Sequence, residues 1–193
     1  MIYETDLSAA MDVIYEEYAQ VPVLAELAAG RPPVRGCGPL DSPFVVVGEA
    51  PGETEERLGR PFAGRSGQLL QELFTFAGLP WNLCYVTNAV CWRPPGNRTP
   101  YPYQVQASQE RLGKETALAH REVIVAAGGV AWRCLTAGRA MPAFEEARLK
   151  WHDLDGTRLL AIPHPAFILR LMHDRQAWEQ RTIDMLSQAL APA

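Results

Sequence analysis

Residues 44–47, with the sequence FVVV, constrain the fold more than any other segment. Three of the four are β-branched and none is polar, which is typical of a strand buried on both faces of a parallel sheet. Residues 84–88 and 122–127 have the same apolar character, and helical patterns over residues 66–77 and 102–120 separate the strands. This alternation predicts an α/β fold: a three-layer α/β/α sandwich with a central four-stranded, mainly parallel sheet.

The N-terminal region is predicted to be helical. Residues 7–29 carry apolar side chains at helical spacing, with Pro22 expected to split the helix and Gly30 to end it. No repeat, low-complexity tract or linker interrupts the rest of the sequence. We therefore expect residues 1–193 to form a single domain in which residues 1–33 are a helical extension.

Local signals place three further features. Asp155-Gly156 between two short apolar runs predicts a hairpin whose second arm is residues 158–162. Ser66 is expected to cap the helix that follows it. A last helix is expected over residues 174–190.

Charge and cysteine content limit the classes of function. The formal net charge is −4, and only Lys114 and Lys150 among the 18 basic residues are lysines. A protein that coats duplex DNA would be basic, whereas arginine suits fixed, bidentate phosphate contacts, so the charge neither establishes nor excludes a nucleic-acid partner. The absence of a Cys-x-x-Cys pair argues against a zinc ribbon and a disulfide framework. The four cysteines are Cys37, Cys84, Cys91 and Cys134.

The sequence also bears on location. No apolar run approaches the ~20 residues that span a bilayer, so no membrane partner is expected. The first twenty residues lack a basic start and an uninterrupted apolar core, which argues against a signal peptide. We expect a cytoplasmic protein of a bacterial or viral host.

The unusual polar residues all follow strands. Residues 48–52 (GEAPG) follow the first strand, Asn88 ends the second, and His164 lies between two prolines after the last. Ligands of open parallel sheets bind beyond the carboxyl ends of the strands, so these residues predict one shared site. A phosphate-binding loop is excluded, because no Gly-Lys precedes a Ser or Thr and several acidic residues follow the first strand.

Three of these segments carry a family resemblance. GEAPGETEERLGRPFAGRSGQLL, YVTNAV followed by RPPGNR, and IPHPAFILR occur in the order and at the separations seen in uracil-DNA glycosylases. From about residue 36 onward, the chain resembles the iron–sulfur-containing branch called family 4. The resemblance implies hydrolysis of the N-glycosidic bond of a uracil that is flipped out of DNA, leaving an abasic site.

The resemblance assigns a role to each motif residue. Phe62 would stack on the base, and Asn88 would pair with its edge. His164 would donate a hydrogen bond to O2 as negative charge develops on the base, and Glu55 would stabilise the cation-like sugar and orient water. The backbone amide of Glu49 is a second donor for O2. The pocket floor would be shaped by Gly48, Glu49, Ala50 and Gly52.

DNA-binding residues are implied in the same way. Ile168 and Leu169 would wedge into the minor groove, although both equally suit the buried start of the last helix. Arg170 would contact a phosphate, and the free amides at the start of a helix would hold another. The residues of that helix start are Arg65, Ser66 and Gly67, and the arginines expected at the mouth of the pocket are Arg93 and Arg98. Glu53 and Glu56 are expected on a solvated face.

The cluster ligands of family 4 are missing from the sequence. Residues 1–35 contain no cysteine, Trp92 directly precedes Arg-Pro-Pro with Cys91 displaced by one, and Ser108 takes the place of the fourth ligand. A cluster needs about four convergent thiolates. We therefore predict no iron–sulfur cluster and no metal, and we expect the N-terminal helix to pack near Trp92 instead.

Other functions remain open at this stage. The same fold could remove a modified pyrimidine or a deaminated purine, or it could inspect flipped bases without catalysis, for example as an extension of a DNA polymerase. A metal-dependent nuclease using the acidic residues is the least favoured. The main hypothesis is a monomeric, monofunctional enzyme acting on single- or double-stranded DNA that contains uracil, with no lyase lysine at the site.

Overall fold

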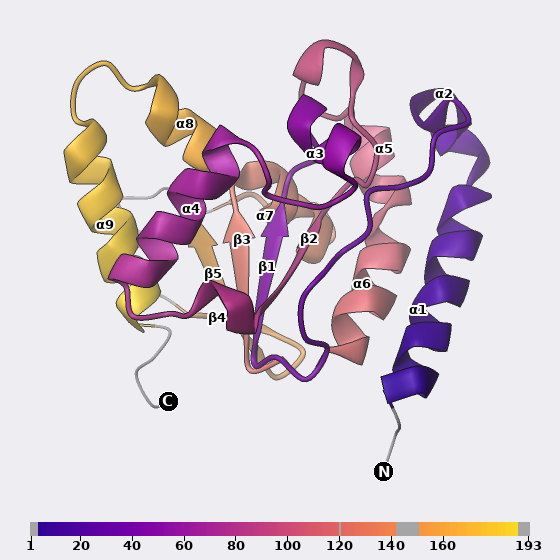
Figure 1. Ribbon diagram of the computed structural model, residues 1–193, viewed down its shortest axis with the longest axis horizontal. Coiled ribbons are helices and arrows are strands. Elements are labelled where there is room, and N and C mark those ends of the chain that lie inside the picture. Colours follow the sequence, from indigo (N-terminus) through magenta and orange to yellow (C-terminus); the bar gives the residue numbers. More distant parts are fainter. Residues whose placement is uncertain (1–3, 120, 142–150, 189–193) are drawn as a thin grey trace.

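A mainly parallel β-sheet forms the middle layer of the protein (Figure 1). The structure is a computed structural model that describes residues 4–119, 121–141 and 151–188. The strands in this part of the chain are β1 (Phe44–Gly48), β2 (Cys84–Asn88), β3 (Val123–Ala127), β4 (His152–Leu154) and β5 (Thr157–Ile162). Their order is β2-β1-β3-β5-β4, and all neighbours run parallel except β4, which pairs antiparallel with β5.

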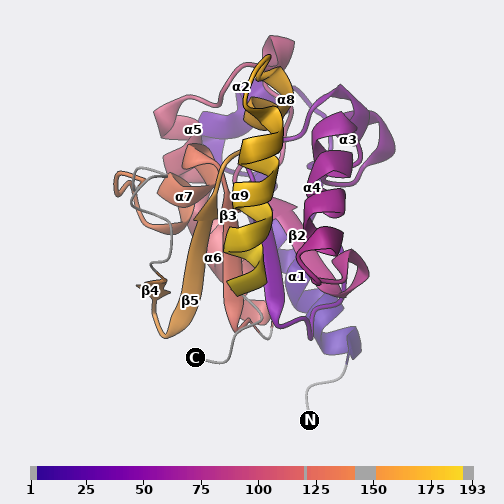
Figure 2. The same cartoon turned by 90° about the vertical axis from the view of Figure 1, so that its left-hand side faces the viewer.

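Helices cover both faces of the sheet. Figure 1 shows α4 (Arg65–Phe76) and α9 (Arg175–Ser187) on one side, and α1 (Glu4–Ala19) and α6 (Gln109–Leu118) on the other. In Figure 2, α9 lies in front of the sheet. α8 (Pro165–Arg170) joins the α4 side, whereas α5 (Pro102–Ala107) and α7 (Gly129–Leu135) join the α1 side. The predicted α/β/α sandwich is confirmed.

The alternation of side chains along the strands produces the two cores. Val46 packs with the helices of the α4 side, whereas Val45 and Val47 pack with those of the α1 side. All three are fully buried. The apolar FVVV segment is therefore a central strand with a hydrophobic core on each face, as its composition predicts.

Most predicted elements are confirmed, with small differences in their bounds. The N-terminal helix is split at Pro22, where η1 (Pro22–Leu24) and α2 (Ala25–Ala28) follow α1, and the chain leaves α2 through a left-handed Gly30. The predicted hairpin is β4 and β5, so the sheet has an antiparallel edge strand beyond the four that were expected. The helix predicted over residues 102–120 is two helices, because Ser108 forms the junction between α5 and α6; residue 120 lies outside the described part.

Three segments complete or correct the predicted elements. The acidic segment after β1 is a short helix, α3 (Glu53–Leu58), in which three acids occupy the first turn, where the helix dipole favours negative charge. Gly64 is the N-cap of α4, and Ser66 lies inside the first turn without capping it. The helix expected from about residue 174 is confirmed as α9, which runs from Arg175 to Ser187 with Asp174 as its N-cap; the predicted end at residue 190 lies outside the described part.

The carboxyl ends of the four parallel strands meet at one edge of the sheet. Gly48 and Asn88 are paired in register at the ends of β1 and β2, and Ala127 and Ile162 are paired at the ends of β3 and β5. The loops that leave this edge contain the predicted site residues. No helix among the described residues has the length and apolar character needed to cross a membrane.

Candidate active site

One cavity of about 380 Å³ lies at the carboxyl edge of the sheet. This volume falls in the usual range for small-ligand pockets. The predicted catalytic and substrate-binding residues line the cavity, with the exception of Gly48. Gly48 lies directly beside Phe62 and Asn88, which do line it. The lining residues are Glu49, Ala50, Pro51, Gly52, Glu55, Phe62, Ser66, Asn88, Pro94, Asn97, Arg98, Thr99, His164, Ala166 and Arg170.

The Phe62 ring is fixed by α4 and by a second aromatic ring. Phe62 has a φ angle of 54°, which residues with a side chain rarely adopt. Its carbonyl accepts a hydrogen bond from Gln71 Nε2 at 3.0 Å. Gly67 permits this close approach, because a Cβ atom there would overlap the Phe62 backbone. The Trp81 ring contacts Phe62 edge-on, with centroids 5.7 Å apart. The position of the Phe62 ring is therefore fixed by the fold.

Asn88 lines the cavity and carries a buried donor without a partner in the described part of the chain. Its side chain is 3% exposed, and Nδ2 has no hydrogen-bond partner among the described residues. A buried donor without a partner costs about 1–3 kcal/mol, so its retention indicates a ligand that accepts from it. A Cβ atom on Gly48 would lie 2.8 Å from Phe62 Cζ and closer still to Asn88 Oδ1. The amide and the ring therefore meet at the one position that lacks a side chain.

His164 is the N-cap residue of α8 and is held as a neutral donor. Its Nδ1 accepts a hydrogen bond from the Ala166 backbone N–H at 3.1 Å, which places the proton of the neutral ring on Nε2. Burial, assisted by the positive charge of Arg170, lowers the pKa of His164 to about 4. Gly128 makes room for the ring, because a Cβ atom there would lie 2.9 Å from His164 Cβ.

Glu55 joins two loops beneath the cavity. The residue is 8% exposed. Its Oε2 accepts a hydrogen bond from the Gly52 N–H at 3.1 Å, and its Oε1 accepts one from the Gly64 N–H at 2.7 Å. These bonds hold the loop after β1 against the start of α4. A carboxylate has about four acceptor sites, so Glu55 retains capacity for a water molecule.

Glu49 is a second carboxyl group at the cavity. Burial raises the pKa of Glu49, and a hydrogen bond with Thr99 and the charges of Arg133 and Arg170 oppose the shift. Ala50 follows it along the wall and has no polar side chain to contribute. The segment after β1 therefore places one carboxyl group beside the cavity and a second one beneath it.

Arg98, which was expected at the mouth of the site, lines the cavity, and so does Arg170, which was expected to contact a phosphate. The Arg98 guanidinium lies over the Tyr101 ring, 3.7 Å from its centroid. Ser66 also lines the cavity, whereas Arg65 is exposed on the surface next to it. Gly67 is buried against the Phe62 backbone, so its clearest structural role is to admit Phe62.

Arg93 differs from the other arginines because two acids of α3 hold it. Its guanidinium lies 3.5 Å from Glu53 and 3.3 Å from Glu56. Glu56 also pairs with Arg31, which precedes β1. Glu53 is exposed, as expected for a solvated face, whereas Glu56 is partly buried. Both acids link α3 to the loop after β2, and Glu56 also links it to the N-terminal region.

The apolar residues of α8 divide between the core and the surface. Ile168 is fully buried in the core on the α4 side, which contradicts its predicted role as a wedge. Leu169 is partly buried and packs against the same core. The exposed apolar side chains of this region are Phe167, at 39%, and Met172, at 91%. A helical turn buries one residue in three or four, which explains why neighbouring residues have different environments.

The residues that replace the cluster cysteines do not fit an iron–sulfur cluster. Tyr18 of α1 stacks on Trp92, with centroids 4.8 Å apart, and its hydroxyl lies 2.6 Å from Ser108 Oγ. Burial raises the pKa of the Cys91 thiol to about 12, which disfavours the thiolate that a cluster requires. Among the described residues, no three His, Cys, Asp or Glu side chains lie together as metal ligands would.

The position of the lysines bears on the type of chemistry. Lys114 lies on the outer surface of α6, where its Nζ pairs with Glu17 at 2.8 Å and with Glu110 at 2.9 Å. It does not line the cavity. Lys150 lies outside the described residues. Within the described part, the cavity therefore has no lysine as a nucleophile.

Several residues that line the cavity or support its side chains were not predicted from the sequence. The loop after β2 contributes Pro94, Asn97 and Thr99 in addition to the predicted Arg98. The prediction of Arg98 could therefore have been extended to its neighbours in this loop. Gly128 follows β3, and the strand-end rule applied to that strand would have found it. Trp81 had no local signal, because it reaches Phe62 only through the folding of the chain around α4.

Comparison with known proteins establishes the family. The sequence model of the uracil DNA glycosylase superfamily matches residues 35–187. The type-4 uracil-DNA glycosylase of Thermotoga maritima is 37% identical over 137 residues, 71% of each chain, and that of Archaeoglobus fulgidus is 32% identical over 155 residues, 76% of each. The chain belongs to the uracil DNA glycosylase superfamily and groups with its type-4 members. A DNA polymerase of Bacillus phage SP01 also matches, at 26% identity over 15% of its length.

Proposed function

We propose that this protein is a monofunctional uracil-DNA glycosylase that hydrolyses the N-glycosidic bond of a flipped-out uracil and leaves an abasic site. The observation that carries the proposal is the unpaired Nδ2 of Asn88, buried in a cavity beside the preorganised Phe62 ring. Membership of the superfamily supports the same reaction. A base enters such a cavity only after it leaves the DNA stack.

Asn88 and Phe62 would select the base. A uracil stacked on Phe62 presents O4 to the Nδ2 donor and its N3–H to Oδ1. Cytosine has an amino group in place of O4, so its donor would face the Asn88 donor. A site that hydrogen-bonds the edge of uracil discriminates strongly against cytosine, because a buried polar group is left unpaired when cytosine is bound. The absence of a side chain at Gly48 lets both groups approach the base.

His164, Glu49 and Glu55 would act on the bond. As the C1′–N1 bond breaks, its electron pair moves to the uracil ring, and the Nε2–H of His164 would stabilise the charge at O2 as a neutral donor. The Glu49 backbone amide would be the second donor. Glu55 would stabilise the cation-like sugar and orient a water molecule, whose hydroxyl adds to C1′ while its proton balances the departing uracil.

The surface around the cavity would bind the DNA backbone. Arg98 and Arg170 reach the mouth, and Arg65 and the free amides at the start of α4 provide a second anion site. The wedge proposed from the sequence is reassigned: Leu169 remains a candidate, and the exposed Met172 joins it in place of Ile168. We further propose that the protein acts as a monomer and without a cluster or metal.

The test is release of free uracil from oligonucleotides that contain it, in excess chelator. Wild-type protein should release uracil and leave DNA that breaks only on later alkali treatment. Substitutions Asn88→Ala and His164→Ala should each lower the single-turnover rate about a hundredfold, as removal of one transition-state donor does. The matched control is Ser187→Ala, an exposed residue of α9 far along the chain from the cavity motifs, which should retain the wild-type rate.

Three outcomes would contradict the proposal. Full activity in both variants would refute the site assignment. Binding without release of any base would favour a base-sensing module, and strand breaks abolished by chelator would favour a nuclease. Oligonucleotides with modified pyrimidines and deaminated purines, run in parallel, test the base specificity. A visible absorption band of the purified protein would contradict the expectation that no cluster is present.

A further inference from the structure

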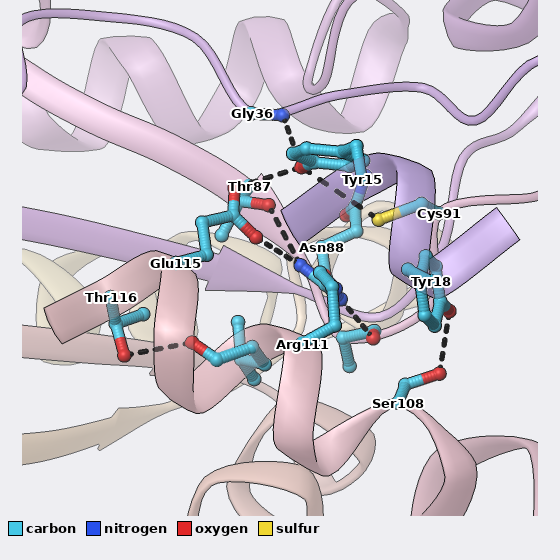
Figure 3. A network of polar contacts seen from close by, with 12 residues as sticks. Tyr15, Tyr18, Gly36, Thr87, Asn88, Cys91, Ser108, Arg111, Glu115 and Thr116 are labelled. Atoms are coloured by element: carbon cyan, nitrogen blue, oxygen red, sulfur yellow. Dashed lines mark hydrogen bonds and ion pairs between the residues drawn. The ribbon is translucent and has the colours of Figure 1, made fainter. Parts of the chain in front are cut away.

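A buried arginine holds the backbone at the end of β2. Arg111 of α6 is 3% exposed, and its Nη2 donates to the carbonyl oxygens of Asn88, at 2.7 Å, and Ala89. Figure 3 shows the guanidinium pointing from α6 to this peptide. In the described part of the chain β2 is an edge strand, and on its outer side Cys37 forms an isolated bridge to Val86, two residues before Asn88. Arg111 is 23 residues from Asn88 and joins it through tertiary packing alone.

The charge of Arg111 is balanced by a second buried network. Arg111 Nη1 pairs with Oε2 of Glu115, one helical turn away, and the Glu115 side chain is 0% exposed. Glu115 Oε1 accepts hydrogen bonds from the hydroxyls of Tyr15 and Tyr85, each at 2.8 Å. A buried ion pair of this kind persists only where further hydrogen bonds satisfy both partners. The two tyrosines supply them for Glu115, and the carbonyls of Asn88 and Ala89 supply them for Arg111 Nη2, whereas Arg111 Nε has no partner among the described residues.

The network also reaches Trp92, which directly precedes Arg-Pro-Pro, where family 4 has a cluster cysteine. The Tyr18 ring centroid lies 5.0 Å from Arg111 Cζ, the Tyr15 centroid lies 5.9 Å from it, and Tyr18 stacks on Trp92. Tyr15 and Tyr18 are one turn apart on α1, so both face α6. The N-terminal helix thereby contacts the end of β2 through Arg111.

We propose that Arg111 is a positioning residue for Asn88, and that Glu115 with Tyr15 and Tyr18 of α1 holds it in place. This inference rests on the proposed function and deepens it. Arg111 fixes the peptide from which the Asn88 amide projects, and it touches neither the base nor the sugar. A shift of the peptide moves the amide relative to the base that stacks on Phe62, and a 1 Å misplacement can cost about a hundredfold in rate.

The experiment is a double-mutant cycle between the network and Asn88. Substituting Arg111→Met together with Glu115→Gln removes both charges, because removing one alone leaves the other buried and unpaired. The single-turnover rate of uracil release should fall about tenfold or more, while the dissociation constant for uracil-containing DNA changes less than about twofold, since only the chemical geometry is disturbed. In the Asn88→Ala background, the same change should cost less than about threefold, because the residue through which it acts is gone.

A matched control separates positioning from general loosening. Leu112→Ala removes a buried, apolar side chain of the same helix that has no polar group to bond Asn88 or Glu115. Any rate loss it causes should be equal in both backgrounds. Melting temperatures of all variants give the folded fraction, to which rates are normalised. If the double variant does not fold, Arg111→Lys keeps the charge beside Glu115 but loses the two-pronged contact with the carbonyls, and it enters the same cycle.

The outcomes distinguish the two proposals. If the wild type releases no uracil, the proposed function fails. A second outcome overturns only the role of Arg111. In it, the wild type releases uracil and Asn88→Ala loses activity, but the Arg111→Met/Glu115→Gln change lowers the rate equally in both backgrounds or not at all. A loss confined to the background that retains Asn88 supports the inference.

Discussion

Adding one carbon atom at Gly48 should close the base-reading site without disturbing the fold. A Cβ atom there would lie 2.8 Å from Phe62 Cζ and closer still to Asn88 Oδ1, whereas ordinary contact begins at 3.4 Å. Gly48 does not have a positive φ, so alanine is tolerated by its backbone. The ring and the amide must therefore separate, the amide by roughly 1 Å, and a displacement of that size lowers rates about a hundredfold. Overpacking should cost about 1–3 kcal/mol in the free energy of unfolding.

The assay is single-turnover uracil release by Gly48→Ala, with thermal unfolding measured on the same preparation. Gly113→Ala is the matched control, because a Cβ atom on Gly113 of α6 meets nothing within 4 Å. The control should keep the wild-type rate and gain about 0.5–1 kcal/mol of stability, as glycine-to-alanine changes inside helices do. A folded Gly48→Ala protein that keeps a third or more of the wild-type rate would refute the reasoning that Asn88 and Phe62 read the base.

Three further predictions concern pH and DNA structure. Because burial holds the pKa of His164 near 4, its ring stays neutral above about pH 5. The ratio of the wild-type rate to the His164→Gln rate should therefore be constant from about pH 5.5 to about 8. An increase of this ratio toward low pH would indicate that the protonated ring is the catalyst. In the unfolded chain His164 becomes protonated below about pH 6.5, whereas in the folded protein it stays neutral down to about pH 4. Lowering the pH from 6.5 to 4 should therefore reduce the melting temperature of the wild type more than that of His164→Gln. Met172→Ser should lower the rate on double-stranded DNA about tenfold and leave single-stranded DNA within about twofold, since only the duplex must be unstacked; equal losses on both would contradict a wedge.

The sequence located the site because three strand ends carry it. Strands with apolar, β-branched residues predict a parallel sheet, and parallel strands deliver their carboxyl ends to one edge, so Asn88 and His164 were expected to converge before any distance was known. The Phe62 position followed from family motifs. The double role of Glu55 as a link between Gly52 and Gly64 was not anticipated, because it depends on the short helix α3.

The features that were missed depend on contacts distant in sequence. Arg111 donates to backbone carbonyl oxygens. Every residue has a backbone carbonyl, so the sequence does not indicate which ones an arginine contacts. The pairing of Arg93 with Glu56 depends on how two loops pack. The burial of Ile168 could not be predicted, because α8 has only six residues and is too short for its sequence to show which face is apolar. Each of these outcomes is a tertiary effect acting on residues with ordinary local preferences.

A structure of the protein with uracil and abasic DNA tests the central claim most directly. The account predicts a uracil ring stacked on Phe62, with Asn88 Nδ2 about 2.9 Å from O4 and His164 Nε2 at hydrogen-bond distance from O2. Uracil bound elsewhere, or bound here with the Asn88 donor still unpaired, would contradict it.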